Sequence, residues 1–224
     1  MNRKIITTAD GSKTIQIEEW NEQYHSVHGA VNEANHVFIK HGLAYFIETF
    51  PNIQPIEILE IGFGTGLNAL ITALKAQELK IKINYVGVEA YPVNQNEIKQ
   101  LNYVDRLSTN NTIFSGMHKC SWENVHNLSP QFTLLKQQKL FSKINQINTF
   151  NLIYFDAFGA RIQPELWTES IFKIMYHSLM DNGILVTYSA KGSVRRAMQA
   201  VGFFVERLPG PPGKREMLRA QKRV

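Results

Sequence analysis

The chain has 224 residues, of which 44% are hydrophobic and 19% are charged, and its formal net charge is +5. This length suits one α/β domain with a small addition, and the hydrophobic content excludes an intrinsically disordered chain. No apolar run reaches the roughly eighteen residues needed to cross a bilayer, and the N-terminus lacks the apolar segment of a secretory signal, so we expect a cytoplasmic protein without a membrane partner.

Side chains that bind metals are few and scattered. Cys120 is the one cysteine, which excludes an intrachain disulfide and a cysteine-rich zinc site. None of the seven histidines stands in the His-Glu-x-x-His spacing of zinc enzymes. We therefore expect no metal. The modest positive charge is compatible with an RNA partner but does not by itself indicate one.

The chain begins with a predicted β-hairpin over residues 4–17, because β-prone isoleucines flank Asp10-Gly11, a favoured tight-turn pair. A predicted helix over about residues 31–49 follows. Its apolar residues roughly keep helical spacing, with Leu43 one position off, and two prolines end it.

Strands and helices then alternate. The expected strands are residues 57–61, 83–88, 132–136, 151–155, 184–188, 203–207 and 216–220, and the expected helices are residues 68–79, 94–107, 165–180 and 193–200. Alternating βα units predict a parallel sheet with helices on both faces, and two final strands without a helix between them predict an antiparallel edge hairpin. We therefore predict an α/β, Rossmann-like fold with a mostly parallel seven-stranded sheet over residues 51–224, after a hairpin-and-helix extension over residues 1–50.

A glycine-rich loop, Gly62-Phe63-Gly64-Thr65-Gly66, joins the first of these strands to a helix. Glycine lets the backbone turn sharply and approach a ligand closely, and ligands of open α/β sheets bind beyond the carboxyl ends of the strands. The third glycine comes one residue earlier than in dinucleotide-binding loops. This spacing after the acidic Glu60 resembles the first motif of class I S-adenosylmethionine methyltransferases. Glu89, which ends the next strand, stands at the distance at which a carboxylate binds ribose hydroxyls.

Asp156 ends a second buried strand and should reach the same edge of the sheet as the glycine loop. A buried carboxylate is costly unless it is paired or lies at a site. We predict that Asp156 is catalytic and that, with an amine acceptor, it takes a proton or orients the nitrogen lone pair. The expected cofactor-binding residues are Glu60, Gly62, Phe63, Gly64, Gly66, Asn68, Glu89, Ala90, Asp156 and Ala157.

Four segments carry a resemblance to a known family. They are Tyr24-His25-Ser26-Val27-His28-Gly29-Ala30, Gly62-Phe63-Gly64-Thr65-Gly66-Leu67-Asn68, Asp156-Ala157-Phe158 with Pro164-Glu165-Leu166-Trp167, and Gly210-Pro211-Pro212-Gly213-Lys214-Arg215-Glu216-Met217-Leu218. Together they resemble the MnmD family, which is the methyltransferase half of the bifunctional MnmC enzyme. The resemblance implies S-adenosylmethionine-dependent methylation of the primary amine of wobble 5-aminomethyl-2-thiouridine in tRNA, giving 5-methylaminomethyl-2-thiouridine, without the flavin oxidase step of the fused members.

The chain departs from the family pattern in two places. Ile162 stands where the pattern tends to have lysine, and Arg161 is a candidate substitute. Many relatives carry Gly-Asp after the third strand, near the adenine, where this chain has Gln137-Gln138. Both departures concern local contacts and leave the predicted fold unchanged.

A flipped wobble base needs stacking surfaces, and an RNA backbone needs cations. The expected substrate-binding residues are Tyr24, His28, Phe158 and Trp167 for the base, and Lys191, Arg195, Lys214 and Arg215 for phosphates. Arg161, the candidate substitute for the family lysine, is also expected to contact the substrate. Trp167 is equally compatible with a place in the core, and Arg195 with a solvated helix face.

Two other functions share these features. Polyamine aminopropyltransferases have the same fold and the same two acidic strand ends, but they usually carry an acidic residue inside the glycine loop, where this chain has Thr65. A non-catalytic RNA-binding module could use the same fold without chemistry, against which the intact glycines, Glu89 and Asp156 argue. The sequence does not indicate an oligomeric state.

Overall fold

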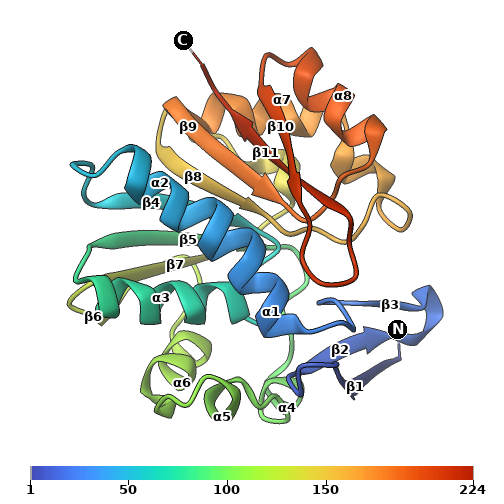
Figure 1. Cartoon of the computed structure of the whole chain (residues 1–224). Helices are drawn as coiled ribbons and strands as arrows, with labels where there is room; N and C mark the ends of the chain where they lie inside the picture. Colours follow the sequence, from blue (N-terminus) through green and yellow to red (C-terminus); the bar gives the residue numbers. More distant parts are fainter. Residues whose placement is uncertain (1, 224) are drawn as a thin grey trace.

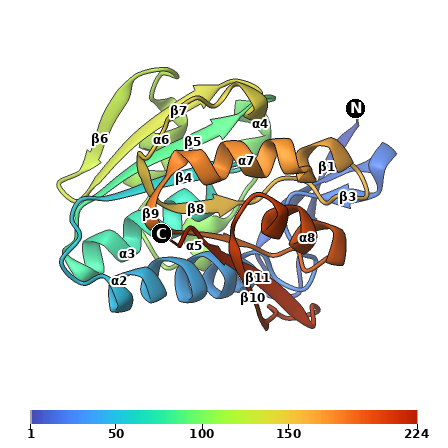
Figure 2. The same ribbon diagram turned by 90° about the horizontal axis from the view of Figure 1, so that it is seen from above.

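Two sheets organise the protein. The computed structural model describes residues 2–223, and in this part of the chain a three-stranded sheet accompanies a sheet of eight strands. In Figure 1 the small sheet, in dark blue, lies near the first helix and near the loop that joins β10 to β11. Helices cover both faces of the large sheet (Figures 1 and 2).

The small sheet contains the predicted hairpin. Its elements are β1 (Arg3–Thr7), β2 (Lys13–Ile17), the 3-10 turn η1 (Glu18–Trp20) and β3 (Glu22–Gln23). β1 and β3 both pair antiparallel with β2. Gly11, in the turn between β1 and β2, has a φ of +81°, which glycine adopts without strain. The hairpin predicted over residues 4–17 is confirmed.

Helical structure then fills the region predicted as a helix. Its parts are α1 (Ala30–Ala34), the π-helix η2 (Asn35–Ala44) and α2 (Tyr45–Thr49). The wider π turn explains how Leu43 is only 1% exposed although it stands off the α-helical spacing. A Cβ atom on Gly42 would lie 3.1 Å from Val186 and 3.3 Å from Tyr154, so this helix packs closely on the large sheet.

The large sheet confirms the Rossmann-like prediction. Its strands are β4 (Ile56–Ile61), β5 (Ile83–Glu89), β6 (Val125–Ser129), β7 (Phe132–Gln138), β8 (Phe150–Phe155), β9 (Leu179–Thr187), β10 (Phe204–Pro209) and β11 (Glu216–Gln221), in the order β10-β11-β9-β8-β4-β5-β7-β6. The five central strands from β9 to β7 are parallel, and the β10–β11 hairpin joins β9 through antiparallel β11.

The large sheet has one strand more than the seven predicted for the described part of the chain. β6 pairs antiparallel with β7 at the edge, and Val125 at its start is 66% exposed. A solvated edge strand needs no apolar run, so no periodic signal marked it. β9 also begins earlier than the predicted strand 184–188, because residues 179–183 lie within the strand, beside an irregular register with β8.

The remaining helices differ from prediction in two regions. They are α3 (Leu67–Leu79), α4 (Gln95–Ile98), α5 (Tyr103–Arg106), α6 (Asn111–Lys119), α7 (Glu169–Ser178) and α8 (Gly192–Ala200), with 3-10 turns η3 (Phe141–Lys143) and η4 (Pro164–Trp167). The helix predicted over residues 94–107 is two short helices, and Asn94 caps the first. The helix predicted over 165–180 is interrupted at Thr168, which is extended and precedes α7. Residues 99–102 separate α4 from α5, and the residues that precede α5 and α7, Asn102 and Thr168, make no side-chain cap hydrogen bond.

The two faces of the large sheet form two hydrophobic clusters. One cluster joins the sheet to the helical segment 30–49 and to α3, and the other joins it to α7 and α8. Figure 2 shows these helices on opposite sides of the strands. Because β4, β5, β8 and β9 are parallel, their carboxyl ends meet at one edge, which is where the candidate site lies.

Candidate active site

A cavity of about 1040 Å³ opens at the carboxyl edge of the large sheet. Its walls are the loop after β4, the ends of β5, β8 and β9, residues 20–28 of the N-terminal extension, and the loop between β10 and β11. Open α/β sheets bind their ligands at this edge, and the volume suits a large small-molecule ligand. The N-terminal extension therefore contributes to the site, whereas its boundary as a separate unit at residue 50 stays a prediction.

The glycine loop forms one wall. Gly62, Gly64 and Gly66 have φ values of +89°, +48° and +75°, which residues with a side chain rarely adopt. A Cβ atom on Gly62 would lie 2.7 Å from the carbonyl oxygen of Asp156, so this position also lacks space for a side chain. The Gly62 amide donates to the carbonyl of Val88 at 3.0 Å, which holds the loop against the end of β5.

Thr65 contacts three side chains outside the loop and thereby stabilises the loop. Its hydroxyl accepts a hydrogen bond from Tyr103 Oη at 3.0 Å and lies 3.4 Å from His25 Nε2. Its carbonyl oxygen lies 3.2 Å from His118 Nε2. Burial lowers the pKa of His25 and of His118 to about 4, so both rings are neutral near pH 7. A histidine of the N-terminal extension therefore supports the predicted cofactor loop.

Glu89 ends β5 beside the loop. Its Oε2 accepts a hydrogen bond from the Gly64 amide at 3.0 Å, and its Oε1 accepts one from the Tyr91 amide at 3.0 Å. The backbone therefore fixes the orientation of this carboxylate. Each oxygen keeps a further lone pair for a hydroxyl donor.

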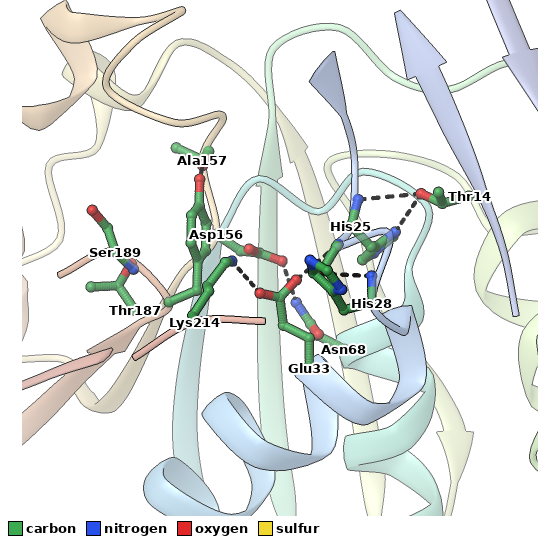
Figure 3. Close-up of polar contacts among 12 residues, drawn as sticks. Thr14, His25, His28, Glu33, Asn68, Asp156, Ala157, Thr187, Ser189 and Lys214 are labelled. Carbon is green, nitrogen blue, oxygen red and sulfur yellow. Dashed lines mark hydrogen bonds and ion pairs between the residues drawn. The ribbon is translucent and has the colours of Figure 1, made fainter. Parts of the chain in front are cut away.

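Asp156 follows β8 and faces the same cavity as the loop. Its amide donates to the carbonyl of Ile61 at 2.9 Å, which sets it beside the end of β4. Asn68 Nδ2 donates to Asp156 Oδ2 at 2.8 Å and to Glu60 Oε1 at 2.9 Å. Figure 3 shows Asn68 directed toward Asp156. The Oδ1 atom of Asn68 is buried and has no hydrogen-bond partner within residues 2–223.

The surroundings of Asp156 favour a proton on it near neutral pH. Burial raises the pKa of Asp156 to about 7, and the nearby Glu33 adds to the rise, whereas the hydrogen bond from Asn68 and the charge of Lys214 oppose it. Burial also raises the pKa of Glu60 well above its ordinary value. Asp156 can therefore exchange a proton at neutral pH, as a general base must.

An ion pair also lines the cavity. Lys214, from the loop between β10 and β11, pairs with Glu33 of α1 (Figure 3). The Lys214 Nζ atom also lies 3.9 Å from the centre of the Tyr188 ring. Tyr188 Oη donates to the carbonyl of Ala157 at 2.8 Å, so the ring is fixed next to Asp156.

Aromatic rings from two parts of the chain meet at the cavity. The ring centre of Phe158 lies 4.9 Å from that of Tyr24 and 5.7 Å from that of Trp20, both edge to face. Arg161 pairs with Glu22 at 3.0 Å, which ties the segment after β8 to the small sheet. The rings offer surfaces on which a base can stack.

Most of the predicted site residues line this cavity. They are Tyr24, His28, Glu60, Gly62, Phe63, Gly64, Asn68, Glu89, Ala90, Asp156, Ala157, Phe158, Arg161, Lys191 and Lys214. Four others, Gly66, Trp167, Arg195 and Arg215, are not part of the lining. Gly66 precedes α3, and Arg195 and Arg215 lie outside the cavity.

Trp167 has a structural place that differs from the predicted base contact. It is 5% exposed and belongs to the hydrophobic cluster around α7. Its Nε1 donates to the carbonyl of Phe158 at 2.8 Å, so it supports the loop from beneath. The indole is a large apolar ring, and packing it in the core removes more surface from water than a rim position would.

Trp20, Glu33 and Tyr188 are among the lining residues that sequence reasoning missed. Tyr188 directly follows β9, so the rule that strand ends meet at one edge could have found it. Trp20 and Glu33 lie in the N-terminal extension, and no local pattern indicates that this segment closes over the sheet edge.

Comparison with known proteins agrees with this geometry. A family model described as S-adenosyl-L-methionine-dependent methyltransferase matches residues 114–223. A protein of Leptospira interrogans named tRNA 5-methylaminomethyl-2-thiouridine biosynthesis bifunctional protein MnmC is 28% identical over 215 residues, covering 90% of this chain and 32% of that protein. The protein of the same name from Burkholderia mallei is 28% identical over 233 residues, covering 96% of this chain and 34% of that protein. Over nearly its whole length the chain is therefore similar to the methyltransferase part of these MnmC proteins.

The MnmC-like domain spans about a third of the length of these curated relatives. Among solved structures, MNMC2 from Aquifex aeolicus superposes with a TM-score of 0.79 at 24% identity, covering 100% of this chain and 71% of that one. Spermidine synthase from Thermotoga maritima superposes with a TM-score of 0.58 at 14% identity, covering 98% and 68%. At these sequence identities, both superpositions show that the chain shares the fold of these structures.

The cavity of the MnmC-like domain fits S-adenosylmethionine. At Gly62 no side chain stands between the backbone and a ligand, Glu89 keeps lone pairs for hydroxyls, and the buried Oδ1 of Asn68 can accept from a donor group. Within residues 2–223, no cluster of three or more His, Cys, Asp or Glu side chains is placed to hold a metal ion. None of the helices in the described part of the chain has the length and apolar character to cross a membrane.

Proposed function

We propose that this domain methylates the primary amine of wobble 5-aminomethyl-2-thiouridine in tRNA, giving 5-methylaminomethyl-2-thiouridine. The observation that carries the proposal is the position of Asp156, with a pKa raised to about 7, in the same cavity as the glycine loop. An alkyl amine is mostly protonated near pH 7, so its methylation needs a group that takes a proton. The proposal covers methyl transfer and not the flavin oxidation, and it includes a cytoplasmic location, where tRNA occurs.

Bound S-adenosylmethionine supplies an electrophilic methyl group on a sulfonium. The glycine loop and Glu89 hold the cofactor, and the rings of Tyr24 and Phe158 hold the flipped base. Asp156 takes one proton from the alkylammonium, which frees the nitrogen lone pair. The lone pair then forms the N–C bond while the S–C bond breaks and its electron pair stays on sulfur. The product is a secondary ammonium, and Asp156 returns its proton to water.

The direct test uses the purified chain, labelled S-adenosylmethionine and tRNA that carries 5-aminomethyl-2-thiouridine. We expect label in the wobble nucleoside, and for Asp156→Asn a loss of turnover of about 100-fold or more with unchanged cofactor affinity. Asp105→Asn is the matched control, because Asp105 is exposed on α5 and lies outside the cavity. Wild-type turnover in Asp156→Asn would contradict the proposed role.

A cellular test examines the substrate independently. Mass analysis of wobble nucleosides from cells lacking this protein should show accumulated 5-aminomethyl-2-thiouridine. A parallel incubation with decarboxylated S-adenosylmethionine and putrescine tests aminopropyl transfer, the reaction of the alternative function considered from the sequence. Product in that incubation, with no label in tRNA, would replace the proposal.

A further inference from the structure

The Glu33–Lys214 ion pair lies within the candidate active site but outside the cofactor loop. Glu33 comes from α1 of the N-terminal extension, and Lys214 comes from the loop between β10 and β11, 181 residues later. Both side chains line the cavity that contains Asp156. Figure 3 shows the pair next to Asp156.

Both partners of the pair are held in place. Glu33 Oε1 accepts from Lys214 Nζ, and Glu33 Oε2 accepts a hydrogen bond from the Ser26 amide at 2.9 Å. The Glu33 side chain is 10% exposed and that of Lys214 is 30% exposed. The Lys214 ammonium also lies over the Tyr188 ring, which itself is anchored to the backbone after Asp156. A surface ion pair has none of these constraints.

The two partners act on Asp156 with opposite sign. The negative charge of Glu33 raises the pKa of Asp156, and the positive charge of Lys214 lowers it. Such effects are large only between charges that are a few ångströms apart and shielded from water. The ion pair has no net charge, but Glu33 and Lys214 each change the pKa of the predicted base, Asp156.

The other polar groups facing Asp156 are less able to supply this influence. From β4 comes Glu60, whose pKa is raised well above its ordinary value by burial, so it favours the neutral form. From β5 and from the end of β9 come Tyr85 and Tyr188, whose pKa values are also raised by burial. From α3 comes the neutral amide of Asn68.

We propose that Glu33 and Lys214 are positioning residues for methyl transfer: Glu33 makes Asp156 a stronger base, Lys214 restrains it, and together they set the pH range in which an amine is accepted. This inference rests on the proposed function. It does not place either residue on the reacting atoms. It assigns the N-terminal extension a part in the chemistry, because Glu33 belongs to that segment.

The test compares the two halves of the pair. Asp156 must be ionised to accept a proton, so kcat/KM rises as pH rises through its pKa. Glu33→Gln should move this acid limb to lower pH, and Lys214→Met should move it to higher pH, each by about one pH unit. Lys214→Arg keeps the charge and should restore the wild-type limb. The double variant should lie near the wild type.

A matched ion pair serves as the control. Lys75 and Glu78 pair at 2.6 Å on α3, with side chains 35% and 60% exposed, outside the cavity. Glu78→Gln and Lys75→Met should leave the pH profile unchanged. A merely structural role for the Glu33–Lys214 pair would lower the melting temperature of both single variants without moving their limbs in opposite directions.

A second readout separates this inference from the proposed function. The carboxyl ¹³C signal of Asp156, identified by its absence in Asp156→Asn, reports its titration in the folded protein without any substrate. If the midpoint of this titration moves to lower pH in Glu33→Gln and to higher pH in Lys214→Met, the inference is supported even when tRNA is not methylated. In that case only the proposed function fails. The inference is overturned if the acid limb of the pH profile and the Asp156 titration stay at the wild-type pH. It is also overturned if they move in the same direction in both variants.

Discussion

Replacing Asp156 with asparagine should stabilise the fold at alkaline pH even though it removes the predicted base. Burial and Glu33 raise the pKa of Asp156 from 3.8 to about 7. A carboxyl group whose pKa is raised in the folded state stabilises the protein below its unfolded value, and that contribution is lost as pH rises through the folded value. Between these two values the folded state holds a proton that the unfolded state has released, so stability falls as pH rises.

The magnitude follows from the displacement of the pKa. Each pH unit between the two values corresponds to about 1.4 kcal/mol, so the ionised Asp156 costs up to about 4 kcal/mol above pH 7. Asp156 borders the cavity, and water there reduces this cost, so we expect about 2–4 kcal/mol. Asparagine has nearly the same shape and can accept the hydrogen bond from Asn68, but it carries no charge.

Urea-induced unfolding without cofactor measures the effect. Asp156→Asn should exceed the wild type in free energy of unfolding at about pH 8.5, and the gain should shrink by roughly 2–3 kcal/mol at about pH 5. In thermal unfolding each kcal/mol corresponds to about 2–4 °C for a chain of this size. Asp105→Asn, which changes an exposed aspartate, should show neither gain. An equal gain at both pH values, or a loss at the higher one, would refute the reasoning.

Three further outcomes test the rest of the site. Gly62→Ala should weaken S-adenosylmethionine binding at least about 10-fold in calorimetry, because its φ of +89° and the contact with Asp156 exclude a Cβ atom. Glu89→Gln should weaken the same binding about 10-fold, because the amide loses the charge that strengthens its bond to the Gly64 amide and to hydroxyls. Lys191→Gln should reduce the slope of log tRNA affinity against log salt by about 1 if this lysine contacts a phosphate.

Two control variants accompany these tests. Gly116→Ala lies on α6, where the nearest side-chain atom to an added Cβ would be 3.5 Å away, and it should leave cofactor binding unchanged. Lys75→Gln removes a cation from α3, outside the cavity, and should leave the salt slope unchanged. Unaltered cofactor affinity in Gly62→Ala or Glu89→Gln would remove the loop from the binding site.

Local pattern was sufficient for the central part of the site. The strand, glycine loop and helix around residues 56–79 follow from apolar runs and glycine spacing, and β8 was predicted to within one residue. Because parallel strands end at the same edge, Asp156 and Glu89 could be expected at the glycine loop before any coordinates. Whether each residue binds as predicted stays a prediction that the experiments above examine.

Local pattern failed where the chain has weak periodicity or where a few non-helical residues divide an apolar pattern. β6 is a solvated edge strand, and α4 and α5 divide what reads as one helix. Trp167 was ambiguous, since an indole suits both a core and a stacking surface, and burial against α7 decided for the core.

The sequence by itself determined the α/β alternation, the glycine loop and the two acidic strand ends, since each depends on residues that are neighbours along the chain. Only the tertiary structure decided that the N-terminal extension brings Glu33 to Lys214, across 181 residues. The pKa of Asp156 depends first on its burial and then on these two charges, and both effects follow distance in space and leave no trace in local spacing.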